Sequence, residues 1–271
     1  MNDRLPDAAL PAPAREVPVL RVSPRGSEQR TDLIAAEVPI ALVFNGISHA
    51  VMMATPADLE AFALGFALSE GLLDSHTECR GIDVIANADG VEIQLEVAAA
   101  AEARLKEQRR SLIGRTGCGL CGIDSLKRLD LLPESVASAD WVSGLQAATV
   151  LRAFAQLPAL QPLNAQTGAH HAAAWVTPEG NITTVMEDVG RHNALDKLLG
   201  QRALARLANH DGFIIMSSRA SYELVRKCAR LGVPVLATIS APTTLAVDIA
   251  RQAGMQLYGF CRGEQAVRYA P

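Results

Sequence analysis

The residues best suited to chemistry are two cysteines, Cys118 and Cys121, which are separated by two residues in a glycine-rich stretch. Four glycines fall among the nine residues 114–122, and each would cost backbone entropy in a helix or strand. We therefore expect a mobile loop that presents reactive sulfur. The thiolate is the reactive form of cysteine, and a short helix predicted from residue 124 would direct backbone N–H groups at the pair and favour that form.

Three kinds of chemistry are compatible with this pair: dithiol redox chemistry, one half of a zinc site, and carriage of sulfur as a persulfide. Structural zinc needs four ligands, and the sequence has no second Cys-x-x-Cys and no His-x-x-x-His. Thioredoxin-like redox chemistry expects the pair after a strand, whereas here it follows a charged helix predicted over 98–110. A pair of buried structural thiols is disfavoured by the neighbouring glycines. The remaining cysteines, Cys79, Cys228 and Cys261, are solitary, which predicts free thiols.

The C-terminal half offers a different site, because three predicted strands end in polar loops that begin helices. These loops span residues 187–193, 217–221 and 240–244. Where parallel strands end at helix N-termini, backbone N–H groups converge on a crevice that suits anions. Charged and hydroxyl side chains in the loops could bind phosphate: Arg191, His192, Ser218, Arg219 and Thr243. The pattern favours a phosphate-bearing ligand such as a nucleotide, and the alternative is that these are ordinary caps and turns.

The elements that must position these residues divide the chain into three parts. Residues 1–35 contain five prolines, which predicts a flexible arm with little structure of its own apart from one strand around residues 17–22. Residues 36–140 predict a smaller α+β domain of hairpins and helices, with a first turn at Asn45-Gly46 and a helix capped by Thr55. Residues 141–271 alternate strands with helices of roughly ten residues, which predicts a three-layer α/β domain with partly parallel strands.

Composition limits the classes of function. The 271 residues are 49% hydrophobic and 20% charged, which is typical of a globular protein. A net charge of −4 gives no general attraction for nucleic acid, so no nucleic-acid partner is expected. The sequence has no run of eighteen apolar residues and no secretory signal pattern, so we expect no membrane contact and a cytoplasmic location.

Several short motifs are specific in combination. They are Cys-Gly-Leu-Cys-Gly at 118–122, Thr-Gly-Ala-His-His-Ala-Ala at 167–173, Glu-Asp-Val-Gly-Arg-His-Asn-Ala-Leu-Asp-Lys at 187–197, Ser-Ser-Arg-Ala-Ser at 217–221, Ser-Ala-Pro-Thr-Thr-Leu-Ala at 240–246 and Gly-Phe-Cys-Arg-Gly at 259–263. Together they resemble the formate dehydrogenase accessory sulfurtransferase family, FdhD. The resemblance runs from about residue 37 to the end of the chain.

The resemblance implies a sulfurtransferase that works as a sulfur relay. A cysteine desulfurase would load sulfur onto Cys118 as a persulfide, with Cys121 as the assisting partner. The protein would pass this sulfur to the molybdenum cofactor, molybdenum bis(molybdopterin guanine dinucleotide), before the cofactor enters formate dehydrogenase. The family's cofactor-binding stretch matches Phe260, Cys261, Arg262, Gly263, Glu264 and Gln265. The family spacing Thr-Gly-x-x-His-Ala-Ala also selects His171, and it leaves His170 unexplained.

The same resemblance implies a C-terminal domain similar to the cytidine deaminase fold, a homodimer, and a guanine nucleotide such as GDP as a mimic of the bound cofactor. No tightly bound metal of its own is expected. Zinc deaminases need His-x-Glu and a later Pro-Cys-x-x-Cys, but His171 is followed by two alanines, so deaminase chemistry is not expected. The alternative function is a non-catalytic chaperone for the finished cofactor, in which Cys118 and Cys121 serve only as contacts.

Overall fold

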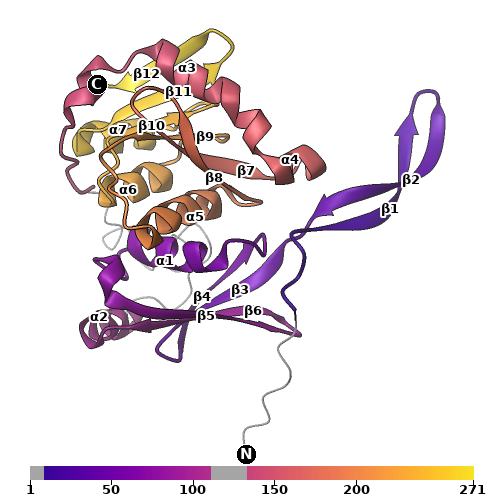
Figure 1. Ribbon diagram of the computed structural model, residues 1–271, viewed down its shortest axis with the longest axis horizontal. Coiled ribbons are helices and arrows are strands. Elements are labelled where there is room, and N and C mark those ends of the chain that lie inside the picture. The colour runs from indigo at the N-terminus through magenta and orange to yellow at the C-terminus, as the bar shows by residue number, and fades with distance from the viewer. Residues whose placement is uncertain (1–8, 111–132) are drawn as a thin grey trace, which may run out of the picture.

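The computed structural model describes residues 9–110 and 133–271, which form a mixed α/β fold (Figure 1). The predicted fold class is therefore confirmed. Cys118 and Cys121 lie outside the described residues, as do the predicted glycine loop and the short helix expected after it. None of the helices in the described ranges is long and apolar enough to cross a membrane.

An antiparallel hairpin projects from the body of the molecule near the N-terminus (Figure 1). It is formed by β1 (Ala14–Ser23) and β2 (Gly26–Ala35). The expectation that residues 1–35 have little structure of their own is therefore wrong for this segment. Its turn reads Ser-Pro-Arg-Gly, with serine, proline and glycine at the positions that a type I turn favours. This turn sequence indicates a hairpin, whereas the five prolines of residues 1–35 favour an unstructured arm.

The next part of the described chain is a four-stranded sheet in the order β4–β3–β6–β5. Its strands are β3 (Val38–Phe44), β4 (Ile47–Ala54), β5 (Cys79–Asn87) and β6 (Gly90–Val97). Both predicted hairpins are confirmed, and Asn45 and Gly46 adopt φ angles of 46° and 77°, as a two-residue hairpin turn requires. Because β3 also pairs with β6 in parallel, the two hairpins make one sheet. Helix α2 (Ala99–Arg110) follows it.

Helix α1 (Leu59–Ser69) lies between this sheet and helix α5 (Arg191–Leu204) from the C-terminal half (Figure 1). Every residue of α1 except Glu60 is buried, because one side packs on the sheet and the other on α5. Gly65 and Gly200 allow the two helices to approach closely. A Cβ atom on either glycine would lie 1.8 Å from a backbone oxygen of the opposite helix.

The C-terminal half is built on a six-stranded sheet, as far as the described residues extend, in the order β12–β11–β10–β9–β7–β8. Its strands are β7 (His171–Val176), β8 (Ile182–Asp188), β9 (Phe213–Met216), β10 (Val235–Thr238), β11 (Gln256–Arg262) and β12 (Gln265–Ala270). β9, β10 and β11 are parallel to one another, whereas β7, β8 and β12 are antiparallel to their neighbours. The prediction of partly parallel strands is confirmed.

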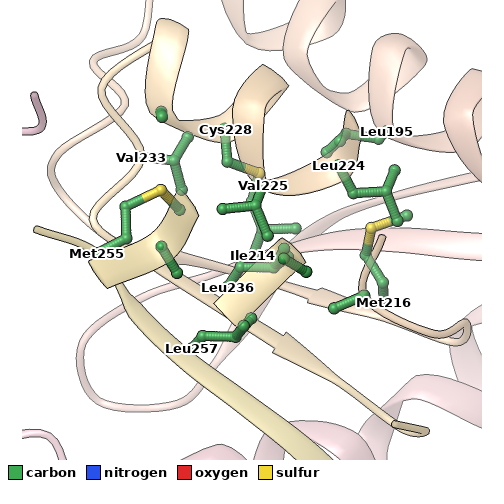
Figure 2. Packing of buried hydrophobic residues seen from close by; sticks show 14 of the residues in the cluster. Leu195, Ile214, Met216, Leu224, Val225, Cys228, Val233, Leu236, Met255 and Leu257 are labelled. Atoms are coloured by element: carbon green, nitrogen blue, oxygen red, sulfur yellow. The ribbon is translucent and has the colours of Figure 1, made fainter. Parts of the chain in front are cut away.

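Helices cover both faces of this sheet, which confirms the predicted three layers (Figure 1). On one face, α5 packs beside α6 (Tyr222–Arg230) and α7 (Thr244–Ala253). On the other face lies α3 (Ala147–Gln156), with the short α4 (Pro162–Thr167) nearby. Strand residues alternate between the faces: Ile214 and Met216 join the first core, and Phe213 and Ile215 the second. Figure 2 shows the first core, where side chains of β9, β10 and β11 meet Val225 and Cys228 of α6.

Buried polar contacts join the two halves of the molecule. Lys197 Nζ lies 2.8 Å from Asp188 Oδ2 and also donates to the Thr55 carbonyl at 3.0 Å. Thr55 N donates in turn to Asp188 Oδ2 at 3.0 Å. The expectation that Thr55 caps α1 is wrong, because that helix begins at Leu59 and Thr55 is bonded across to the end of β8. Lys227 of α6 pairs with Asp196 of α5 at 2.8 Å and also donates to Ser69 Oγ of α1 at 2.8 Å.

Candidate functional site

The three polar loops predicted from the sequence lie side by side at one end of the six-stranded sheet. β9, β10 and β11 end there, and so does β8, while β7 begins there because His171 pairs with Asp188. Backbone hydrogen bonds link the loops: Ser240 N donates to the Ser218 carbonyl at 3.4 Å, and Phe260 N to the Ser240 carbonyl at 3.1 Å. We call this region the carboxyl edge. It comprises His171, Arg191, His192, Ser218, Arg219, Thr243 and residues 260–265.

The carboxyl edge is long enough for an extended ligand. From β8 to β11 it spans four strand spacings, or about 19 Å at ~4.8 Å per strand. Helices α5, α6 and α7 all begin at this edge, so their N-terminal N–H groups and positive dipole ends lie along it. The arrangement is the one in which open α/β sheets bind ligands.

Arg191 and His192 occupy the first turn of α5. The Nε atom of Arg191 and the Nε2 atom of His192 are buried, and neither has a hydrogen-bond partner in the described part of the chain. Buried donors without partners are rare in native proteins. Arg191 Nε lies at a helix N-terminus, where an anionic ligand would satisfy it. This is the strongest structural sign of a ligand at the carboxyl edge.

His171 lies beside them at the start of β7 and is half-buried. Burial lowers the pKa of His171, and the positive charge of Arg191 lowers it further. The imidazole is therefore neutral at pH 7 and can donate or accept a hydrogen bond. His170 is buried beside it: its Nδ1 atom bonds with Thr167 Oγ1 at 2.9 Å, and its Nε2 atom has no hydrogen-bond partner among the described residues.

Glu223, in the first turn of α6, is a residue that sequence reasoning missed. Its Oε2 atom lies 3.8 Å from His192 Nε2, which is too long for a hydrogen bond but close enough for an ion pair when the imidazole is protonated. Burial alone would raise the pKa of Glu223, yet its interactions with His192, Ser221 and its own backbone N–H lower it to about 2. The carboxylate is therefore charged at neutral pH. Its position after a loop serine gave no signal that it would face His192.

The two hydroxyl residues proposed for phosphate binding already have partners within the protein. Ser218 is buried, and its Oγ atom donates to the Arg219 carbonyl at 3.0 Å. Thr243 caps α7, because its side chain accepts a hydrogen bond from Ala246 N at 3.2 Å. Their side chains therefore fit the alternative of ordinary caps and turns. Arg219, by contrast, is exposed and free to reach a ligand.

Residues 260–265 form the end of β11 and the turn into β12. Phe260 has a φ angle of 52°, a strained conformation for a bulky residue that is most often found at functional sites. The Arg262 guanidinium lies 5.8 Å from the centre of its ring, within the range of a cation–π contact. Gly263 supplies the positive φ of the turn, and Glu264 and Gln265 are exposed beside it. The stretch thus presents an aromatic ring and a guanidinium at the edge.

Cys261 differs from its neighbours, because its side chain points into the core beneath α3. Its Sγ atom lies 3.7 Å from the Gly259 carbonyl, and burial raises the pKa of the thiol to about 12. Only the backbone of Cys261 can reach a ligand at the carboxyl edge. Cys79, Cys228 and Cys261 are all free thiols, and burial also raises the pKa of Cys79 and of Cys228. In the described ranges, no group of His, Cys, Asp and Glu could hold a metal ion.

Much of the motif at 187–197 has a structural role. Glu187 accepts hydrogen bonds from the backbone N–H groups of Leu163 and Asn164. Asp188 and Lys197 form the buried pair described above, and Asn193 donates to Asp188 Oδ1 at 2.9 Å. The motif therefore does two things. Asp188 and Lys197 join the halves of the molecule through Thr55, and Arg191 and His192 face the carboxyl edge.

Comparison with known proteins identifies the family of this fold and site. Residues 35–271 match the model of the FdhD/NarQ family, and the chain belongs to that family. It is 57% identical over 238 residues to the sulfur carrier protein FdhD of Chromobacterium violaceum, covering 88% of each chain. It is 51% identical over 272 residues to the sulfur carrier protein FdhD of Burkholderia cenocepacia, covering 99% of this chain and 97% of the relative.

A solved structure has the same fold. It is the crystal structure of a protein from Desulfotalea psychrophila that has been proposed to be a formate dehydrogenase accessory protein. The two structures superimpose with a TM-score of 0.71 over 97% of this chain and 98% of the other, at 23% sequence identity. At that identity the likeness establishes the shared fold.

Proposed function

We propose that this protein is a sulfur carrier that takes up sulfur as a persulfide on Cys118 and delivers it to the molybdenum cofactor destined for formate dehydrogenase. The observation that carries the proposal is that relatives about half identical over nearly the whole chain are sulfur carrier proteins. The glycine-flanked cysteine pair at 118–122 and the cationic carboxyl edge support it.

In the loading step, the Cys118 thiolate attacks the terminal sulfur of a persulfide on a cysteine desulfurase. The bond between the two desulfurase sulfurs breaks, the desulfurase cysteine leaves as a thiolate, and Cys118 becomes the persulfide. No external oxidant or reductant is required, because the reaction only exchanges one sulfur–sulfur bond for another. Cys121 assists as a neighbouring thiol, and its removal should slow loading without abolishing it.

The carboxyl edge would hold the molybdenum cofactor as the acceptor substrate. Its guanine dinucleotide arms carry phosphates, which suit the unpartnered Nε atom of Arg191 at the N-terminus of α5. Arg219 and Arg262 add two exposed guanidinium groups farther along the edge, and the Phe260 ring offers a surface for a base or pterin. A span of about 19 Å matches an elongated dinucleotide rather than a single small anion.

The test of sulfur carriage is mass spectrometry of the protein after incubation with a cysteine desulfurase and cysteine. We expect the peptide that contains Cys118 to gain the mass of one sulfur atom, and the gain to disappear after reduction. Cys118→Ala should abolish loading, whereas the matched control Cys79→Ala should load normally. Sulfur uptake and formate dehydrogenase activation that persist in Cys118→Ala would overturn the proposal.

The alternative is a chaperone that binds the finished cofactor and carries no sulfur. It predicts that Cys118→Ala and Cys121→Ala together leave formate dehydrogenase activation intact while Arg191 variants abolish it. The sulfur carrier predicts that both classes of variant fail, and that only the cysteine variants fail at loading. The protein is proposed to act as a cytoplasmic homodimer, which light scattering on the purified chain would test.

A further inference from the structure

A cavity of about 580 Å³ lies far from the carboxyl edge, where α1 and β5 meet the end of α5. Arg191 begins α5 and Arg206 follows its last turn, so the two places are about 20 Å apart along the helix axis at ~1.5 Å per residue. The volume falls within the range of about 300–1,000 Å³ that small-molecule sites occupy. No residue of the cavity belongs to the six motifs that identify the family.

The lining of the cavity combines an apolar part with a rim that carries two arginines. Leu64 of α1, Ile82 of β5 and Leu204 of α5 form the apolar part, and Leu204 is 45% exposed. Arg80 and Arg206 line the same cavity and are exposed. Within the described residues, neither guanidinium forms an ion pair.

The other charged side chains near the cavity are Glu60, which lines it, and Glu96, whose carboxylate lies close to Gly81. The rim therefore carries charges of both signs above an apolar surface. Its two guanidinium groups, of Arg80 and Arg206, are the donors that the cavity offers to an anionic ligand.

Arg206 has a backbone conformation that its side chain does not favour. Its φ angle is 55°, and it follows α5 at the position where helices usually place glycine. The backbone bonds complete this helix-ending motif: Arg206 N donates to the Ala203 carbonyl, and Leu207 N to the Arg202 carbonyl. Glycine would satisfy the same geometry with less strain. Arg206 therefore presents its side chain on the rim of the cavity at some cost in backbone strain.

We propose that this cavity binds a small organic anion with an apolar body. Arg80 and Arg206 would hold its carboxylate or phosphate group, and its hydrocarbon or ring would lie on Leu64, Ile82 and Leu204. The site is independent of the sulfur chemistry proposed above, because it shares no residue with the carboxyl edge or with Cys118.

Cys79 provides a built-in reporter, because its half-buried thiol lines the cavity. Burial raises the pKa of Cys79, so its reaction with iodoacetamide is slow and can be timed at mildly alkaline pH. The alkylated peptide is identified by mass spectrometry, which separates Cys79 from the other cysteines. A ligand in the cavity should protect Cys79, and the dependence of the rate on ligand concentration gives the affinity.

The probes are octanoate and phenyl phosphate, which differ in the anionic group, and octanamide, which is neutral. We expect at least one anion to protect Cys79 and octanamide not to protect it. Arg206→Gly should weaken protection about tenfold or more, as loss of a charge-assisted hydrogen bond predicts. The same variant should melt at an unchanged or higher temperature, because glycine relieves the strained backbone. A purely structural arginine would not combine these two effects.

The matched control is Arg25→Gly, which removes the same charge from the exposed turn of the β1–β2 hairpin. It should leave protection unchanged. The proposal is overturned if neither anion protects Cys79, if octanamide protects it equally, or if Arg206→Gly binds as tightly as the natural chain. An equal loss in Arg25→Gly would also overturn it, because the effect would then reflect net charge alone.

Discussion

The interface between the two halves of the molecule and the carboxyl edge differ in whether their buried polar side chains have partners within the protein. At the interface, Lys197 and Asp188 are fully buried and lie 2.8 Å apart, and Lys227 pairs with Asp196 at the same distance. At the carboxyl edge, the buried Nε atom of Arg191 has no hydrogen-bond partner among the described residues, and His192 faces the Glu223 carboxylate at 3.8 Å. Paired charges fix one arrangement of the chain, whereas an unpartnered donor is available to a ligand.

One segment, residues 187–197, supplies side chains to both regions. Asp188 ends β8 and Lys197 lies in the second turn of α5, and together they hold α5 against the N-terminal half. Arg191 lies between them, at the N-terminus of the helix that they fix. Breaking a buried ion pair costs stability, since it leaves a charge without compensation. The interface thus holds the first turn of α5 in place for binding, and variants on the two sides should affect different measurements.

The largest effect is expected from Lys197→Met. This change leaves the Asp188 carboxylate and the Thr55 carbonyl without their shared donor, and it should lower the free energy of unfolding by about 3 kcal/mol or more. Urea unfolding followed by circular dichroism measures it. As a control, Lys106→Met removes an exposed pair with Glu102 and should cost less than about 1 kcal/mol. Equal losses of stability in the two variants would show that the buried ion pair contributes no more than the exposed one.

A moderate, pH-dependent effect is expected from Glu223→Gln at the carboxyl edge. The pKa of Glu223 lies near 2 in the folded protein, below its ordinary value of 4.5. The folded state therefore favours the carboxylate, and the resulting stabilisation is complete above pH 4.5 and lost as the pH falls toward 2. Glu223→Gln should cost about 1–2 kcal/mol at pH 7 after allowance for screening by solvent. Urea unfolding at pH 7, 4.5 and 3 should show this difference shrinking, and a constant difference would contradict the assignment.

The smallest expected effect is on stability, when Thr243, which caps a helix, is compared with Ser221, which precedes a helix without capping it. The Thr243 side chain accepts a hydrogen bond from Ala246 N at the start of α7, whereas Ser221 precedes α6 without a side-chain cap. Thr243→Ala should lower the free energy of unfolding by about 1 kcal/mol, and Ser221→Ala by less than half as much. Thermal melts of the two variants make the comparison. A ligand-binding defect in Thr243→Ala without loss of stability would instead return Thr243 to the binding residues.

The elements of the fold that local pattern determines were predictable from the sequence. The turn at Asn45-Gly46 and the alternation of strands and helices after residue 170 follow from backbone preferences and burial of alternate side chains. The same reasoning identified the three loops of the carboxyl edge, since helix starts after strands can be recognised locally. It could also infer that they meet, because parallel strands end at a common edge of a sheet.

Contacts between distant segments were not predictable in this way. Thr55 has the sequence context of a helix cap, but it is bonded to Asp188, which lies 133 residues away. Glu223 faces His192 only because α5 and α6 start side by side, and nothing in its own neighbourhood indicates that contact. The sequence also does not show which polar residues of the motif at 187–197 are structural. Asp188 and Lys197 are as polar as Arg191 and His192, which face the carboxyl edge.

The most direct test of the carboxyl edge as a ligand site is the affinity of the protein for GDP, measured by calorimetry for the natural chain and for Arg191→Gln. We expect binding to the natural chain, a loss of about tenfold or more in the variant because a charge-assisted contact to phosphate is removed, and an unchanged melting temperature. Arg25→Gln, in the hairpin turn, should bind GDP as the natural chain does. Equal affinities of the natural chain and Arg191→Gln would contradict the claim that the carboxyl edge is the binding site.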